Sequence, residues 1–289
     1  MMLVEQGVTS LKYFQYILFK MLLQQFLNQK LKNYQFPLLA GGTAWGEQSI
    51  ADGSIHLDML RLNKVKYNLK KKTVRVEAGA QWRKVQRILD KYGRAVKVMQ
   101  SDNIFTVGGS LSVNVHGWQV GSPPIASTVI SLKVVTADGK IRHIDKGKDS
   151  ELFRAVLGGY GQFAVITEVE LKTVPNSTLK FHAKFISSED FAKEYFHRVT
   201  QNPKAQLAYG RLSVDKGKLF EEAGVFWYEK ALGKTLPGLK QESLVAIKRV
   251  IFRSSQYTDF GKRIRWSAEK LYAKTLLSSK AISRNDVMN

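Results

Sequence analysis

Two glycine-rich segments hold the residues of this chain whose types and spacing best suit chemistry. The first runs from Gly41 to Ser49 and the second from Thr106 to Gly117. Glycine lacks a Cβ and takes positive φ angles, so consecutive N–H groups there can approach a ligand closely. Such groups form a nest for anionic oxygens, most often those of phosphates. The pair of segments predicts one long phosphate-bearing cofactor, and their order favours a flavin dinucleotide.

The elements that position these segments follow from hydrophobic periodicity and turn residues. Strands are predicted over residues 36–40, 54–59, 65–69, 73–78, 129–135, 141–144, 164–174, 206–214 and 224–228. Helices are predicted over residues 11–26, 81–92, 150–157 and 187–199. Gly93 ends the second of these helices in the usual C-terminal position. Ser187 followed by Asp190 predicts the start of the last one.

A third glycine motif, residues 159–164, fits the G-x-G-x-x-G/A pattern of nicotinamide-binding domains. That pattern has meaning only where it follows a strand and opens a helix. Here the order is reversed, because a helical pattern precedes the motif and a strand pattern follows it. The sequence therefore argues against a nicotinamide-binding domain.

Composition and charge bound the remaining possibilities. The 289 residues are 44% hydrophobic and 24% charged, which is typical of a soluble globular protein, and they include no cysteine. Disulfides, thiolate metal sites and a cysteine-linked flavin are therefore excluded for these residues, and no metal site is expected. The formal net charge of +21 favours anionic partners or a solvated basic surface. The basic residues are spread along the chain without aromatic interleaving, which argues against nucleic-acid binding.

The apolar-rich segment of residues 11–26 contains Lys12 and Lys20. A signal peptide needs an uninterrupted apolar core, and a spanning helix needs roughly 20 apolar residues. The segment meets neither condition. We expect an amphipathic helix packed on the domain, with a helix at a membrane surface as the alternative.

Taken together, these segments resemble the PCMH-type FAD-binding domain of the vanillyl-alcohol oxidase family. The resemblance covers residues 38–175, and six segments match in order. They are residues 41–49, 53–58, 73–80, 106–117, 137–139 and 158–167. Sugar and alditol oxidases and decaprenylphosphoryl-ribose oxidase share the His-Gly pair that ends the second glycine-rich segment.

The resemblance implies roles for particular residues. The first segment would wrap the FAD pyrophosphate, the second would line the other side of the cofactor, and backbone groups of a later strand would bind the flavin ring. The implied cofactor-binding residues are Gly41, Gly42, Thr43, Ala44, Trp45, Gln48, Ser49, Ser101, Thr106, Gly108, Gly109, Ser112, Asn114, His116, Gly117, Val165 and Ile166.

His116 is the one candidate catalytic residue, and two roles for it are open. It is either a hydrogen-bonded loop histidine or a residue near the flavin ring that orients the substrate or tunes the ring. Many members of the family link FAD to a histidine in the first segment, but Thr43 and Ala44 stand at the expected His-Ser pair. The FAD is therefore expected to be non-covalent.

The expected fold is α+β. A two-part PCMH-type FAD-binding domain over residues 1–175, with an atypical helical start over residues 1–35, would precede a partial α+β substrate or cap domain over residues 176–289. The family's substrate domain continues further than this chain, so the chain is expected to be truncated at its C-terminus.

The expected function is that of an FAD-dependent oxidoreductase that oxidises a CH–OH group of an alcohol, sugar or hydroxy acid by hydride transfer. The expected partners are a small-molecule substrate and an electron acceptor, either oxygen or a quinone. The alternatives are a flavin-binding fragment without activity and a basic surface-binding protein that retains the fold. The expected location is cytoplasmic, with peripheral contact to an anionic membrane as a hypothesis from charge alone.

Overall fold

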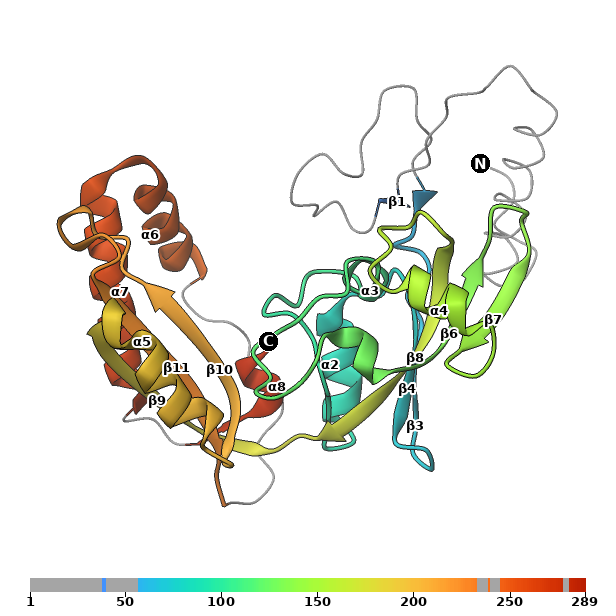
Figure 1. The fold of residues 1–289 in the computed structure, drawn as a ribbon, viewed down its shortest axis with the longest axis horizontal. Helices are drawn as coiled ribbons and strands as arrows, with labels where there is room; N and C mark the ends of the chain where they lie inside the picture. The colour runs from blue at the N-terminus through green and yellow to red at the C-terminus, as the bar shows by residue number, and fades with distance from the viewer. Residues whose placement is uncertain (1–37, 40–56, 233–238, 240–244, 278–280) are drawn as a thin grey trace. The chain divides into compact units, whose positions relative to one another are not determined.

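The computed structural model of the chain describes residues 38–39, 57–232, 239, 245–277 and 281–289 (Figure 1). The chain divides into two compact units. Unit 1 comprises the residues up to Gly117 together with Pro123–Val174, and unit 2 comprises Trp118–Ser122 together with Pro175–Asn289. Each unit combines helices with a mainly antiparallel sheet, which confirms the predicted α+β class.

The main sheet of unit 1 is built from the predicted hairpins and the long strand that follows the third glycine motif. In spatial order its strands are β3 (Val65–Asn68), β4 (Thr73–Glu77), β8 (Val165–Pro175), β6 (Val129–Val135) and β7 (Ile141–Asp145), with β5 (Arg94–Val96) paired to β8. The β3–β4, β4–β8, β8–β6 and β6–β7 pairs are antiparallel. A separate parallel pair joins β1 (Leu38–Leu39) to β2 (Leu57–Asp58).

Three helices of unit 1 pack beside this sheet or lead into its strands. The helix α2 (Trp82–Asp90) has Trp82, Val85 and Leu89 fully buried, as its periodicity predicts. Gly93, at a φ of 61°, follows its C-terminal end. The helix α4 (Ser150–Val156) precedes the third glycine motif and β8 follows it, which is the element order that argued against a nicotinamide-binding domain.

The second glycine-rich segment differs from the extended loop that the sequence predicts. Residues Val107–Ser112 form the short helix α3. The physical reason is its N-cap, because Thr106 has an extended backbone and its side chain accepts a hydrogen bond from the N–H of Gly109 at 3.3 Å. The segment is therefore a capped helical turn followed by a loop.

The sheet of unit 2 has the strand order β10, β11, β9 and β12. The bounds are β9 (Thr178–Ser187), β10 (Ala205–Leu212), β11 (Glu222–Lys230) and β12 (Ile282–Ser283). The strand β9 was not predicted. It nevertheless lies between β11 and β12 and pairs along its length with β11. The strands predicted over residues 206–214 and 224–228 are confirmed as β10 and β11.

Different elements pack against the two faces of this sheet. One face packs against α5 (Phe191–Tyr195) and the π-helical turn Phe196–Thr200. Its core cluster consists of Val199, Ala205, Ala208, Val225 and Trp227. The predicted helix of residues 187–199 is thus present as three short helical pieces, since the 3₁₀ turn Ser188–Asp190 precedes α5.

The other face is aromatic. The Phe226 ring lies 4.8 Å from the ring of Tyr209 and 5.5 Å from that of Phe185, measured between centroids. The ring of Phe185 in turn meets Trp266 of α7 (Asp259–Leu277) edge-on at 5.8 Å. Burial in this cluster raises the pKa of Tyr209 to about 12. The apolar surface of this sheet is therefore supplied mainly by rings.

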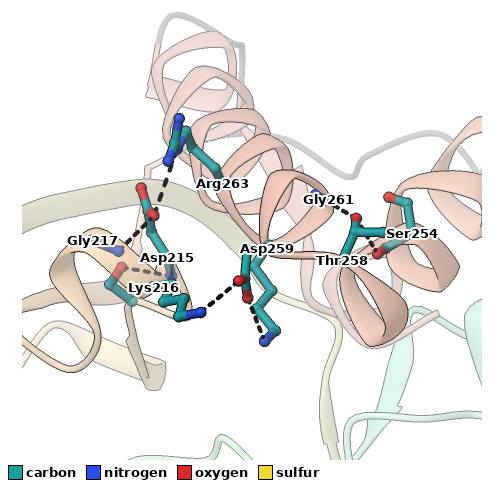
Figure 2. A network of polar contacts seen from close by, with 10 residues as sticks. Asp215, Lys216, Gly217, Ser254, Thr258, Asp259, Gly261 and Arg263 are labelled. Atoms are coloured by element: carbon teal, nitrogen blue, oxygen red, sulfur yellow. Dashed lines mark hydrogen bonds and ion pairs between the residues drawn. The ribbon is translucent and has the colours of Figure 1, made fainter.

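The helices α6 (Val245–Tyr257) and α7 pack against each other, and sequence periodicity predicted neither. A polar network fixes the start of α7 (Figure 2). Asp259 accepts from Lys216 at 2.9 Å, and Asp215 pairs with Arg263 at 3.7 Å. Gly261 lies so close to α6 that a Cβ there would be 2.2 Å from the Ser254 carbonyl oxygen. The chain ends in α8 (Arg284–Val287).

Candidate cofactor site

The first turn of α3 is held by main-chain hydrogen bonds to a neighbouring segment. The N–H of Gly108 donates to the carbonyl of Ala78 at 2.8 Å, and the N–H of Val107 donates to that of Ala80 at 2.9 Å. With the N–H of Gly109 donating to Thr106, these amides already have protein acceptors. They stabilise the position of α3 beside residues 78–80, and the nest of free N–H groups predicted from the sequence does not form at these three positions.

Glycine is required at position 108 by this close approach. A Cβ at Gly108 would lie 2.8 Å from the Cβ of Ala78 and 3.0 Å from its carbonyl oxygen. Ala78 is itself tied to β8, because its N–H donates to the carbonyl of Thr167 at 2.9 Å. The helix, the end of β4 and the first residues of β8 are therefore joined through backbone groups alone.

The C-terminal end of α3 contacts the third glycine motif. The N–H of Gly158 donates to the carbonyl of Leu111 at 3.0 Å, and the N–H of Tyr160 donates to that of Ser112 at 2.9 Å. Gly158 has a φ of 87°, a conformation that side-chain-bearing residues rarely adopt. Residues 106–117 and 158–166, which are far apart in the sequence, are thus joined by main-chain hydrogen bonds, and this joined region is called the glycine surface.

Three polar side chains predicted to line the cofactor have internal partners. Ser112 donates its hydroxyl proton to the carbonyl of Gly108 at 2.9 Å. Asn114, at a φ of 47°, accepts through Oδ1 from the N–H of Ala126 at 3.1 Å. Thr106 is the helix cap described above. These residues shape the loop, and direct contact with a cofactor stays a prediction for each of them.

The remaining predicted residues fall into two groups. His116 is exposed and Gly117 is half-buried, and the chain passes from unit 1 to unit 2 directly after Gly117. Val165 and Ile166 open β8 opposite Val135 and Val134 of β6, and Ser101 is exposed. The other group lies outside the described residues. It consists of Gly41, Gly42, Thr43, Ala44, Trp45, Gln48 and Ser49.

A buried hydrogen-bonded chain behind α3 was missed by the sequence analysis. The indole Nε1 of Trp82 donates to the hydroxyl of Ser110 at 2.8 Å, and that hydroxyl donates to the side-chain oxygen of Gln100 at 2.6 Å. Trp82 and Ser110 are both buried. The sequence could have indicated this chain through Ser110, which lies inside the glycine-rich segment at a position that faces the core once the segment is helical. These two hydrogen bonds link α3 to Trp82 of α2 and to Gln100.

A polar hollow lies on the sheet of unit 1, apart from the glycine surface, and is lined in part by Arg75, Lys133 and His143. Its charges are mutually paired, because Glu168 is 3.7 Å from Arg75 and 3.8 Å from Lys133. Arg75 also reaches Glu170 at 3.5 Å. The described residues include no group of three or more His, Asp or Glu that could hold a metal ion. The glycine surface remains the better candidate site.

The helix α3 and the loop that follows it lie in a region that matches a known family, whereas residues 158–166 lie beyond that region. The family model described as an FAD binding domain matches residues 27–145. The chain contains an FAD-binding domain. The α+β fold of unit 1 agrees with this assignment, and FAD is the cofactor. The finer assignment to the vanillyl-alcohol oxidase family stays a prediction.

Several characterised proteins are similar to this chain. The mitochondrial L-galactono-1,4-lactone dehydrogenase of Brassica oleracea is 30% identical over 139 residues, which cover 48% of this chain and 23% of that protein. The decaprenylphosphoryl-beta-D-ribose oxidase of Mycolicibacterium smegmatis is 25% identical over 198 residues, which cover 62% and 42%. The L-gulonolactone oxidase of Bos taurus is 29% identical over 175 residues, which cover 57% and 40%. The chain spans less than half the length of each of these relatives.

Proposed function

We propose that this chain binds FAD without a covalent bond and is part of an oxidoreductase that oxidises a CH–OH group of a sugar, a sugar lactone, an alcohol or a hydroxy acid. The observation that carries the proposal is the match of residues 27–145 to an FAD-binding domain, whose glycine-rich helix α3 is joined by main-chain hydrogen bonds to the turn at residues 158–160. The names of the relatives, two of which refer to sugar lactones and one to a ribose derivative, support the substrate class.

The donor set of the site fits FAD. Hydroxyl and amide side chains (Ser101, Ser112 and Asn114) and backbone groups of Val165 and Ile166 would hold the cofactor, together with residues 41–49. Small residues admit close contact with a ring or a pyrophosphate. Bound FAD supplies a two-electron acceptor for a hydride. Thr43 and Ala44 at the family's His-Ser pair, and the lack of cysteine, support a non-covalent flavin.

The chain's own residues would orient and shield the reaction. The main-chain bonds from Gly158 and Tyr160 to α3 keep the glycine surface in one shape, and the hydrogen-bonded chain through Trp82 supports it from behind. In this proposal His116, exposed at the end of the segment, orients the substrate hydroxyl or tunes the cofactor. Either oxygen or a quinone would take up the electrons.

The first test is the visible absorbance of the purified chain before and after acid precipitation. Flavin bands that move to the supernatant would support non-covalent FAD, whereas a yellow pellet would contradict it. Anaerobic bleaching by a panel of sugars, lactones, alcohols and hydroxy acids would then test the reaction. A bound flavin that dithionite reduces and no substrate bleaches would favour a flavin-binding chain without turnover. A protein that stays colourless with added FAD would overturn the proposal.

A matched pair of glycine variants tests the site itself. Gly158→Ala places a side chain at a φ of 87° where the turn meets α3, whereas Gly121→Ala does so at a φ of 64° with no atom within 4 Å. Both carry a left-handed strain of about 1–2 kcal/mol. We expect Gly158→Ala to weaken FAD binding about tenfold, and Gly121→Ala to leave it unchanged. Equal FAD affinity in both folded variants, measured by fluorescence titration, would contradict the proposed site.

A further inference from the structure

The helix α7 carries an exposed apolar stripe. Phe260 is 69% exposed, Ile264 is 38% exposed and Leu271 is 68% exposed. Their spacing of four and seven residues places them along one side of the helix. These are large side chains whose contact with water is unfavourable.

The opposite side of α7 is already occupied. Trp266 and Ala273 are buried, and Trp266 meets the aromatic face of the unit 2 sheet through Phe185. Gly261 is pressed against α6. The stripe is therefore not the face with which α7 packs on its own unit.

The helix α6 also carries exposed apolar side chains. Val250 is 66% exposed, Phe252 is 49% exposed and Tyr257 is 84% exposed. Arg265 of α7 lies over the Phe252 ring at 5.0 Å, so the two helices contact each other through this pair. The name α6–α7 surface refers here to the exposed side chains of these two helices.

The same surface is basic. Over residues 250–257 and 259–277, whose side chains the structure describes, the two helices contain six Lys or Arg residues and two acidic residues. Both acids are engaged, since Asp259 pairs with Lys216 and Lys262 while Glu269 pairs with Arg211 and Arg265. Exposed Arg253 and Lys274 lie beside the apolar residues. Charge on this surface therefore favours an anionic partner.

We propose that the α6–α7 surface binds an anionic lipid bilayer at the level of the headgroups. An interfacial helix needs apolar side chains that reach the acyl boundary and Lys or Arg residues that meet acidic headgroups. The aliphatic side chains of Ile264 and Leu271 make no polar contacts with the phosphates of a nucleic acid. A lipid interface accommodates both of them together with the charged Lys274. No helix among the described residues is long and apolar enough to cross a membrane, and the binding is peripheral. The proposal does not depend on the flavin.

The test is sedimentation of the full chain with phosphatidylcholine vesicles, with and without phosphatidylserine, at low and high salt. We expect binding only to the anionic vesicles, reduced by salt. The apolar variant Phe260→Ser/Ile264→Ser/Leu271→Ser should bind on the order of tenfold less. The charge variant Arg253→Glu/Lys274→Glu should lose about fivefold or more for each residue.

Matched control variants distinguish binding by the α6–α7 surface from a general effect of net charge or of exposed apolar area. Lys70→Glu/Lys71→Glu changes the charge equally on the exposed β3–β4 turn, and Leu69→Ser removes a 66% exposed apolar side chain there. Both should bind like the unchanged protein. The proposal is overturned if the chain ignores anionic vesicles, if control and test variants lose binding equally, or if gel filtration shows a dimer that only the apolar variant dissociates.

Discussion

The sheets of the two units are stabilised by different kinds of contact. In unit 1 the core strands carry aliphatic residues such as Val74, Leu132 and Leu171, and the candidate site is tied together by backbone hydrogen bonds between small residues. In unit 2 the sheet carries rings, and its helix α7 is attached by Trp266 and by polar side chains. The candidate site of unit 1 therefore depends on the absence of side chains at a few positions, and the sheet of unit 2 depends on large aromatic side chains.

This difference bears on function. A ligand that is recognised by close backbone approach needs a surface whose shape does not change, and main-chain bonds between Gly108, Gly158 and their partners provide that. The aromatic and basic residues of unit 2 leave large side chains in solvent on α6 and α7. The first arrangement suits a buried cofactor, and the second suits an extended contact surface.

The largest expected effect comes from removing a ring in unit 2. Phe226 is 3% exposed and contacts Tyr209 and Phe185. Phe226→Ala should lower the free energy of unfolding by about 3–5 kcal/mol, because it removes buried apolar area and leaves a cavity. Urea unfolding measures this. The control Phe196→Ala removes a 54% exposed ring and should change the value by about 0.5 kcal/mol or less. Equal effects of the two variants would mean that the rings are not what holds unit 2.

Adding one methyl group in unit 1 should lower the free energy of unfolding nearly as much. A Cβ at Gly79 would lie 1.7 Å from the carbonyl oxygen of Met59, so the backbone must move. Gly79→Ala should cost about 3 kcal/mol through overpacking. Gly147→Ala is the control, because the nearest atom to its Cβ is Asp145 Oδ1 at 3.5 Å. If thermal unfolding showed Gly79→Ala to be as stable as Gly147→Ala, unit 1 would not depend on backbone approach as argued here.

The same contrast explains what the sequence could predict. Strands β3, β4, β6 and β7 follow from alternation and turn residues, because hairpin partners are close in the chain, and β8 follows from its own alternation. The Thr106 cap was also present in the sequence, but the glycines that follow are poor helix formers and concealed α3. Main-chain pairing of residues 106–112 with residues 78–80 and 158–160 is a long-range contact that no local pattern specifies.

Unit 2 was less predictable for a physical reason. The strand β9 does alternate, with Leu179, Phe181 and Phe185 on one side, but Lys and His on the other side made it resemble a polar segment. The helix α7 has apolar residues on its exposed side as well as its buried side, so its periodicity is weak. Contacts such as Phe185 to Trp266 fix these elements only after folding.

The smallest of the three effects concerns the carboxylate that attaches α7 to its sheet. Glu222 of β11 accepts from Lys270 and from the Trp266 indole, and Lys218 also donates to it. The hydrogen bond from Lys270, followed by those from Trp266 and Lys218, lowers the pKa of Glu222 from 4.5 to about 2. Glu222→Gln should cost about 1.5 kcal/mol at pH 7, within the range for hydrogen bonds to a charged group.

The stabilisation by the Glu222 carboxylate should change with pH in a defined direction. A carboxyl group whose pKa is lower in the folded state stabilises the fold above its unfolded pKa, near 4.5, and loses that contribution as the pH falls through about 2. Stability curves of the unchanged protein and of Glu222→Gln should therefore be parallel at neutral pH and converge between pH 4.5 and about 2. The exposed control Glu189→Gln should follow the unchanged protein throughout. Curves that stayed parallel down to pH 2 would show that the charge of Glu222 does not stabilise the attachment of α7 to the sheet.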